Sequence, residues 1–485
     1  MSVRRVAAND RLPQVGPAAP RSAGPKTKEE GARVRQLAPQ ATGRLEILTA
    51  DDLERLDEAA LHVLATTGIS VPSPPARAAL VAAGAQSAGQ TVRIPADVVR
   101  RLVSLAPAHL TLGARANRTL VTGEGSLLTT DGCPTDIYDL ETGAKRPTTS
   151  ADGVAITRIV DALDDVDFCW TAVSAQDRPV ARRGLYEIYD VLANTGKHVQ
   201  TVTIVDETQA RVAVEMARAI AGGDLGVRRA PPISALLGTI TPLGHDEGTL
   251  GAGLVFAEAG VPIGFVTMPQ GGSTTPVTMA GSLVVGIAEV LSGVCAIQAA
   301  FPGAPVFVCF IPSVMDLHSG DFSGGAPEDT LMAAAAGNIG AFYGLPTQCG
   351  TNASAAKTPG WQSVIDDVTT TYLSILAGVD MLAGVGMVAG GRIFSFEELI
   401  LGTEVAAAAR AAARAAAATD GPADAGPSGA YGAARGLVAG LCGSDGAAGG
   451  AREAARRLAR AILERHIPPA LEPALDVELR RLVAG

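Results

Sequence analysis

Aromatic residues make up only 4% of this 485-residue chain, and its six cysteines are scattered without one CxxC pair. A chain of this length does not need disulfides to hold a core, so we expect reduced thiols and a cytoplasmic location. The N-terminus lacks the apolar stretch of a signal peptide. The most apolar window, residues 283–301, contains Glu289 and Gln298 and has no flanking basic cluster, which favours a buried helix over a membrane span.

Local motifs for metals, nucleotides and nucleophiles are also missing. The sequence has no HxH, HExxH or clustered Cys/His spacing, so we predict no metal site. It has no GxxxxGK[ST], no GxSxG and no GxGxxG after a predicted strand. Acidic residues outnumber basic ones by 49 to 39, and the formal net charge of −10 argues against nucleic acid as a partner.

Composition divides the chain into four parts. Residues 1–43 mix Pro, Gly and basic side chains with few bulky apolar ones, which predicts a disordered arm. Leucines at helical spacing then predict a small helical module over residues 44–110. Residues 406–485 are rich in Ala and Gly, which predicts a helical extension with a flexible linker near 420–450. We expect this extension to serve a homo-oligomer.

The remaining part, residues 111–405, carries a regular alternation of strands and helices. Eight short β-rich runs begin about 30 to 42 residues apart, which is the size of one βα unit. They lie near residues 126–130, 168–173, 199–204, 233–239, 263–267, 305–310, 346–349 and 379–383. Eight such units predict an α/β fold of the (β/α)8 type, a TIM barrel. A doubly wound open sheet is the competing fold, but its usual nucleotide signals are missing.

In a TIM barrel, reactive groups lie on the loops that follow the strands. The candidates in those positions are Asp131, Tyr138, Trp170, His245, Gln270, Gly271, Gly272, His318, Asn352 and Lys357. Several have a structural alternative: Asp131 as a turn cap, His245 as a local hydrogen-bonding residue, and Trp170 as a core residue. The backbone N–H groups after Gln270 could cradle an anion or belong to an ordinary tight turn.

Several longer segments have a specific pattern in a fixed order. They are TDGCPTDIYD (130–139), ETG (141–143), Arg146-Pro147, Asp152, TPL (241–243), MPQGGSTTPVT (268–278), PGAP (302–305), Met315-Asp316 with Gly320, and GAPE (325–328). Over about residues 45–405, this order resembles the trimethylamine methyltransferase (MttB-like) superfamily. The resemblance implies a TIM barrel that transfers a methyl group from a methylated amine to Co(I) of a separate corrinoid protein. The cobalamin would be carried by that partner, with no cofactor bound tightly here.

The resemblance also suggests a class of substrate. Trimethylamine enzymes of this family use pyrrolysine, whereas this chain has only standard residues and is similar to the non-pyrrolysine branch. We therefore expect a quaternary amine such as glycine betaine, another betaine or carnitine. Aromatic faces would attract its ammonium group, and the leaving amine is already neutral, so no general acid is needed. Donors for a substrate carboxylate would come from His318, Gln348, Asn352 or Lys357.

On strand-end position and family motifs together, the candidates fall into two groups. The catalytic group is Asp131, His245 and His318, and the substrate-binding group is Trp170, Tyr138, Gln270, Gly271, Gly272, Gln348, Asn352 and Lys357. The family's usual acidic loop after the seventh strand is replaced here by CGTNASAAK (349–357). The alternatives are a binding protein that has lost methyl transfer and a barrel lyase, although Lys197 and Lys357 are the only lysines between residues 150 and 400.

Overall fold

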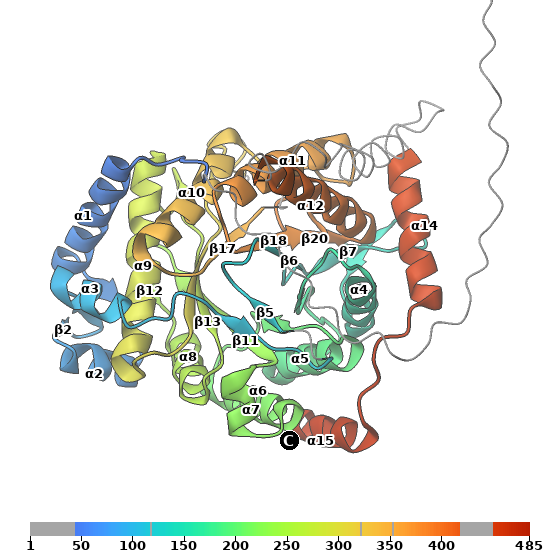
Figure 1. Cartoon of the computed structure of the whole chain (residues 1–485), viewed down its shortest axis with the longest axis horizontal. Coiled ribbons are helices and arrows are strands. Elements are labelled where there is room, and N and C mark those ends of the chain that lie inside the picture. Colours follow the sequence, from blue (N-terminus) through green and yellow to red (C-terminus); the bar gives the residue numbers. More distant parts are fainter. Residues whose placement is uncertain (1–43, 117–118, 321–322, 352–353, 418–449) are drawn as a thin grey trace, which may run out of the picture. The chain divides into compact units, whose positions relative to one another are not determined.

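The computed structural model describes residues 44–116, 119–320, 323–351, 354–417 and 450–485. The predicted N-terminal arm, nearly all of the predicted linker and the candidate Asn352 lie outside these described residues. All described residues belong to one unit of the chain, and Figure 1 labels many of its helices and strands.

Eight parallel strands form a closed barrel, as the sequence predicts. Each strand pairs with the next, the last pairs with the first, and a bridge between Thr129 and Phe168 joins the first to the second. In chain order they are β6 (Leu127–Thr130), β9 (Cys169–Trp170), β10 (Val199–Thr201), β11 (Ile233–Ile240), β13 (Ile263–Thr267), β15 (Val306–Phe310), β17 (Thr347–Gly350) and β18 (Met381–Val385). The eight predicted strand positions are therefore confirmed.

One long helix follows each strand and covers the outside of the barrel (Figure 1). These helices are α4 (Ser150–Ala162), α5 (Arg183–Asn194), α6 (Glu207–Ala221), α8 (Glu247–Ala259), α9 (Met279–Ala300), α10 (Pro327–Tyr343), α11 (Trp361–Leu376) and α12 (Phe396–Ala417). Asp206 and Asp246 cap α6 and α8, and left-handed glycines end both. The short helices η1 (Val180–Arg182) and α7 (Asp224–Arg229) lie in the connections.

Helix α9 is the apolar segment that the sequence marked as a buried helix. Among the described residues it is the one helix long and apolar enough to cross a membrane, but 78% of its apolar window is buried inside the protein. It packs on β13 and β15 and is covered by the N-terminal helices. Its apolar side chains are thus explained by packing inside this chain.

The N-terminal module is helical, as predicted, but it also contains short strands. Its helices α1 (Ala50–Thr66), α2 (Pro74–Ala82) and α3 (Ala96–Val103) pack on α9. Its strands are β1 (Ile69–Ser70), β2 (Gln86–Ala88) and β3 (Thr91–Arg93), and β1 pairs with β12 (Gly244–His245), which folds back on β11. Strands this short depend on their pairing partners, which local sequence does not indicate.

The N-terminal end of the barrel is closed by a hairpin of β4 (Thr111–Leu112) and β5 (Leu120–Val121). Leu110 and Leu112 pack with Phe168 and Phe307 in a separate apolar core inside the barrel. His198 at the foot of β10 binds the carbonyl oxygen of Gly113 through Nδ1, at 2.7 Å. Access to the barrel interior is therefore from the opposite end, where the strands finish.

Two small sheets lie at that opposite end. One joins β7 (Asp136–Tyr138) to β8 (Lys145–Pro147) and to the last pair, β19 (Met387–Val388) and β20 (Ile393–Ser395). The other pairs β14 (Gln270–Gly271) with β16 (Ser313–Val314). They tie together loops that are far apart in the sequence and give the barrel mouth a fixed rim.

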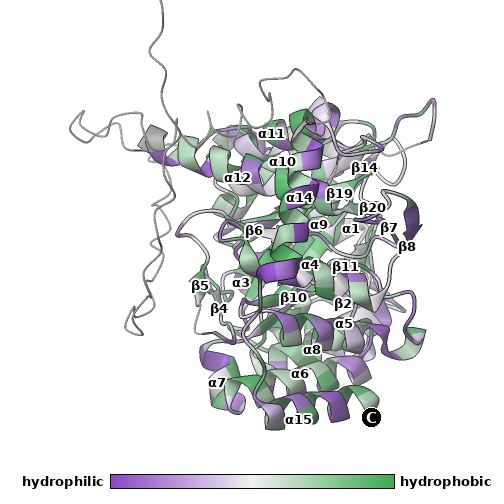
Figure 2. Ribbon diagram, turned by 90° about the vertical axis from the view of Figure 1, so that its right-hand side faces the viewer, coloured by the Kyte–Doolittle hydropathy of each residue, from purple (hydrophilic) through white to green (hydrophobic). Residues whose placement is uncertain are grey.

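The C-terminal extension packs on the barrel's own helices. The helical extension predicted over residues 406–485 contains α14 (Gly450–Arg465), which contacts α4 and α12. A further helix, α15 (Pro473–Ala484), contacts α5 and α6. In Figure 2, α6, α14 and α15 carry both hydrophilic and hydrophobic residues, as helices with one buried face do. The homo-oligomer stays a prediction.

Candidate functional site at the barrel mouth

Asp131 and Gly132 directly follow β6 and stand at the barrel mouth. The Asp131 side chain is 8% exposed, and burial raises its pKa to about 6. Its Oδ1 accepts the N–H of Gly132 at 2.7 Å, so part of the predicted turn-capping role is present. A Cβ on Gly132 would lie 2.9 Å from the ring of Trp170 and 2.9 Å from Val202, so only glycine lets this backbone rest on the Trp170 ring.

Trp170 and Gln348 are both on the inner wall of the barrel, and Trp170 belongs to the apolar core that also contains Phe168 and Phe307, so its predicted alternative role as a core residue is present. Trp170 is 2% exposed and Gln348 is fully buried. Gln348 Nε2 donates to Gln200 Oε1 at 3.0 Å, and Gln200 Nε2 donates to Ser234 Oγ at 3.3 Å. Among the described residues, Trp170 Nε1 and Gln348 Oε1 have no hydrogen-bond partner. Buried polar atoms normally have one, so these two atoms can still pair with a water molecule or with a bound ligand.

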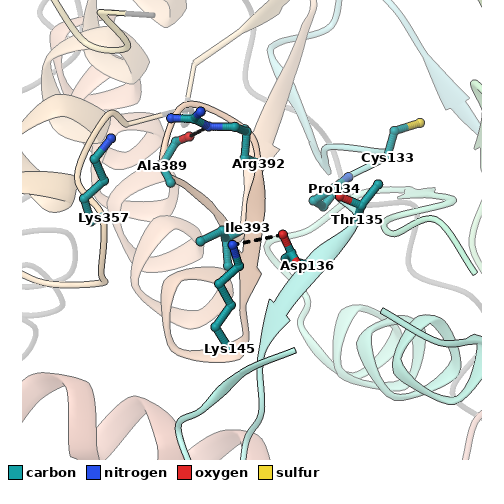
Figure 3. A pocket seen from close by; sticks show the side chains of 10 residues that line it. Cys133, Pro134, Thr135, Asp136, Lys145, Lys357, Ala389, Arg392 and Ile393 are labelled. Atoms are coloured by element: carbon teal, nitrogen blue, oxygen red, sulfur yellow. Dashed lines mark hydrogen bonds and ion pairs between the residues drawn. The ribbon is translucent and has the colours of Figure 1, made fainter. Parts of the chain in front are cut away.

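Tyr138 and Lys357 meet at the rim, although 219 positions separate them. The Tyr138 hydroxyl donates to the Lys357 carbonyl oxygen at 2.7 Å. Lys357 lines a cavity of about 470 Å3 next to the mouth, together with residues from the first and last βα loops. Figure 3 shows this cavity, with Lys145, Lys357 and Arg392 as its basic side chains.

The segment after Gln270 is a tight turn. The Gln270 carbonyl oxygen accepts the backbone N–H groups of Ser273, Thr274 and Thr275, at 3.1, 3.1 and 3.2 Å. These donors are already used within the turn, so they do not cradle an anion, and the turn alternative holds. Gly271 is buried and pairs with Val314, whereas Gly272 is exposed and has φ of 85°, where glycine is favoured.

The two candidate histidines are not brought together with Asp131. His245 is buried between β13 and α9, where its Nε2 lies 2.8 Å from Ser292 Oγ and its ring contacts Phe265 edge-on. Burial lowers its pKa to about 4. This position behind the barrel wall corrects the predicted strand-end placement, because β11 turns back into β12 and His245 is the last residue of β12. His318 is exposed on a turn, and its backbone N–H donates to Asp316 Oδ1.

Sequence reasoning missed three polar residues of this region. Gln200 faces the barrel interior between two outward residues of β10, and its place in a β-alternation was the available signal. Lys145 and Arg392 reach the cavity from β8 and from the turn before β20. No local signal connects these two, because only the pairing of β7 with both β8 and β20 brings their loops together.

Neither a metal site nor a lysine for Schiff-base chemistry is found in the described wall. No group of three or more His, Cys, Asp or Glu residues able to hold a metal occurs among the described residues. Lys197 is buried below β10, and its Nζ donates to the carbonyl oxygens of Val160, Leu163 and Val166. A lysine held in this way supports the barrel, which counts against the lyase alternative.

The fold and the mouth therefore define a TIM barrel whose interior wall contains an aromatic side chain and two amides. The trimethylamine methyltransferase (MTTB) family matches residues 19–431, and the chain belongs to this family. It is 28% identical over 375 residues to the glycine betaine methyltransferase of Desulfitobacterium hafniense (strain Y51), covering 76% of this chain and 77% of that protein. It is 30% identical over 388 residues to the trimethylamine methyltransferase MttB of Methanosarcina barkeri, covering 74% of each.

A solved structure supports the fold. The monomethylamine methyltransferase MtmB of Methanosarcina barkeri matches with a TM-score of 0.52 at 12% identity, covering 86% of this chain and 88% of that chain. The family resemblance and the barrel are thereby confirmed. The chain is a methyltransferase that acts on methylated amines.

Proposed function

We propose that this enzyme transfers a methyl group from a betaine-like quaternary amine to Co(I) of a separate corrinoid protein. Trp170 at the wall of the mouth carries the proposal. A quaternary ammonium has no N–H to donate, and an aromatic face attracts it by about 0.5 to 2 kcal/mol per ring. The relative named glycine betaine methyltransferase supports a substrate of this kind.

The proposed reaction needs no general acid or general base from the protein. One N–CH3 bond breaks, the electron pair stays on the nitrogen, and the amine leaves neutral. The Co(I) nucleophile belongs to the partner protein and is a substrate here, so we propose that this chain binds no cofactor tightly. The residues at the mouth then have two tasks, to orient one methyl group outward and to exclude water.

The described mouth suits these two tasks. Trp170 would hold the ammonium group, while the Gln348 amide, fixed by Gln200, would orient the rest of the substrate. Burial raises the pKa of Asp131 to about 6, so this side chain adds at most one negative charge near the cation. We also propose a cytoplasmic location, because Co(I) persists only under reducing conditions and the five described cysteines are free.

The test mixes the purified full-length protein with a corrinoid protein reduced to Co(I) and follows the cobalt absorption spectrum. Glycine betaine, longer betaines, carnitine, choline and trimethylamine are added separately. Conversion to methyl-Co(III) with a betaine is the expected result. If no amine is converted while the same corrinoid protein accepts methyl from a control enzyme, the proposal is wrong and calorimetry on the same amines identifies a binding protein.

A pair of tryptophan variants sharpens this test. Trp170→Leu removes the aromatic face inside the mouth, whereas Trp361→Leu changes a side chain that is 79% exposed at the start of α11. We expect the first to raise KM for the quaternary amine and the second to leave it unchanged. Equal effects of the two variants would contradict the role of Trp170.

A further inference from the structure

Gly238 stands on the inner face of β11, close to the barrel mouth. Side chains along a strand point alternately to its two faces. Leu236 belongs to the apolar core inside the barrel, whereas Leu237 lies outside, where a Cβ on Gly253 of α8 would be 2.6 Å from it. Gly238 therefore faces the interior, one step nearer the mouth than Leu236, and it is half-buried.

The interior beside Gly238 is an open space. A Cβ added to this glycine would have no atom within 4 Å beyond its chain neighbours, and its φ is not positive. Two other inward glycines of the barrel differ. A Cβ on Gly264 would lie 2.2 Å from the Phe307 ring, and one on Gly350 would lie 3.1 Å from Ile311. Those two glycines allow close packing, whereas Gly238 leaves room that a larger side chain could fill.

The wall beside this space is apolar. Gly238 pairs with Val266 of β13, which is buried in the interior core. The Ile311 N–H donates to the Thr267 carbonyl oxygen at 3.0 Å, so strand pairing continues past β13 and Met268 keeps the inward side. Met268 is nevertheless 56% exposed. A large apolar side chain left exposed in a concave mouth is typical of a ligand site.

Deeper in the barrel the wall becomes polar. Ser234, four residues before Gly238 on β11, accepts from the Gln200 amide, and Gln200 accepts from Gln348. Gln348 is fully buried, and its Oε1 has no hydrogen-bond partner among the residues that the structure describes. The mouth therefore has an apolar upper layer and a polar lower layer. Methyl groups on nitrogen have no donor to offer, so they suit the upper layer beside Gly238.

We propose that the space beside Gly238 receives the N-alkyl groups of the amine, and that the missing side chain sets the largest amine that the enzyme accepts. Carbon atoms in contact lie about 3.5 to 4.0 Å apart, so the clear space has room for at least one methyl group. The inference rests on the proposed function for its class of ligand, a quaternary amine. It extends that function by naming the residue that determines size, and it does not require contact with the Trp170 ring.

The test is calorimetric binding of glycine betaine and of N,N-dimethylglycine, which has one methyl group fewer, without any methyl acceptor. In Gly238→Val the affinity for glycine betaine should fall relative to dimethylglycine by about 10-fold or more, as an extra methylene does in a tight pocket. Gly238→Ala should give a smaller fall. Because the added Cβ touches nothing, Gly238→Ala should unfold in urea at no lower concentration than the wild type. Ala88→Val, on exposed strand β2, is the matched control.

Each result has a clear reading. An unchanged ratio of the two affinities in Gly238→Val, or an equal loss for both ligands, would overturn the size-determining role. If both ligands bind normally to the variant but methyl transfer to Co(I) slows, the space serves the acceptor and the inference is wrong. A wild-type protein that methylates no cobalt acceptor, with variants that change the ratio as expected, would instead overturn the proposed function and keep the role of Gly238.

Discussion

Glu289 offers the sharpest test of how the structure holds the barrel rim. This fully buried carboxylate lies on α9, and its Oε2 accepts the hydroxyl groups of Thr239, Thr241 and Thr267 at 2.7, 2.9 and 2.6 Å. Its Oε1 accepts the backbone N–H of Leu243 at 2.8 Å. One side chain thus binds two strands and the segment 241–243, which carries part of the family pattern.

The substitution Glu289→Gln keeps the size of this side chain and removes its charge. If the amide oxygen faces the three hydroxyl groups, the amide NH2 faces the Leu243 N–H, and two donors oppose each other. Hydrogen bonds to a charged group contribute about 1.5 to 3 kcal/mol, and a buried unsatisfied donor costs about 1 to 3 kcal/mol. We therefore expect the free energy of unfolding to fall by about 2 to 4 kcal/mol.

The assay is urea unfolding followed by circular dichroism, with Glu258→Gln as the control because Glu258 is exposed at the end of α8. Exposed substitutions of this kind change the free energy of unfolding by about 0.5 kcal/mol or less. An unfolding curve for Glu289→Gln that matches the control would refute the reasoning, since it would mean that the four contacts contribute nothing beyond an uncharged amide.

Three further predictions concern the site and the extension. The pKa of Asp131 is raised to about 6 from 3.8, so the folded state holds its proton more tightly, and this stabilisation should be lost as pH rises from about 4 to 6; Asp131→Asn should remove this slope from unfolding measured over that range. Trp170→Phe should keep KM for the quaternary amine within about fivefold, because one ring remains, whereas a loss equal to that of Trp170→Leu in steady-state assays would contradict a ring–cation contact. Arg410→Met should lower the free energy of unfolding by about 3 to 5 kcal/mol in urea, since it leaves the buried Asp167 without its ion-pair partner.

The barrel could be predicted because its signals are local. Each strand is a short apolar run and each helix has its own cap, such as Asp206 before α6, so spacing alone gave the order of eight βα units. The apolar helix α9 was also predicted as buried, since Glu289 and Gln298 interrupt it. Here sequence succeeds because backbone preference and apolar patterning act over a few residues.

Predictions at the site were less complete for a physical reason. The position of residues at strand ends predicted that Asp131 and Trp170 lie at the barrel mouth, and both follow or end an inner strand. The same reasoning misplaced His245, because β11 folds back into β12. It also missed Lys145 and Arg392, whose loops meet only through strand pairing. In the sequence, Glu289 only interrupts an apolar segment. Its role as a hydrogen-bond acceptor could not be predicted, because its four partners lie on other elements.

The sequence by itself determined the family, the order of the elements and the residue types available at the strand ends. Those properties depend on local preference and on motifs that can be compared position by position. Only the tertiary structure decided which side chains face the interior, which lie behind the barrel wall against a helix, and which basic side chains line the cavity between the first and last βα loops. These outcomes depend on barrel closure and strand register, which are set by contacts between residues hundreds of positions apart.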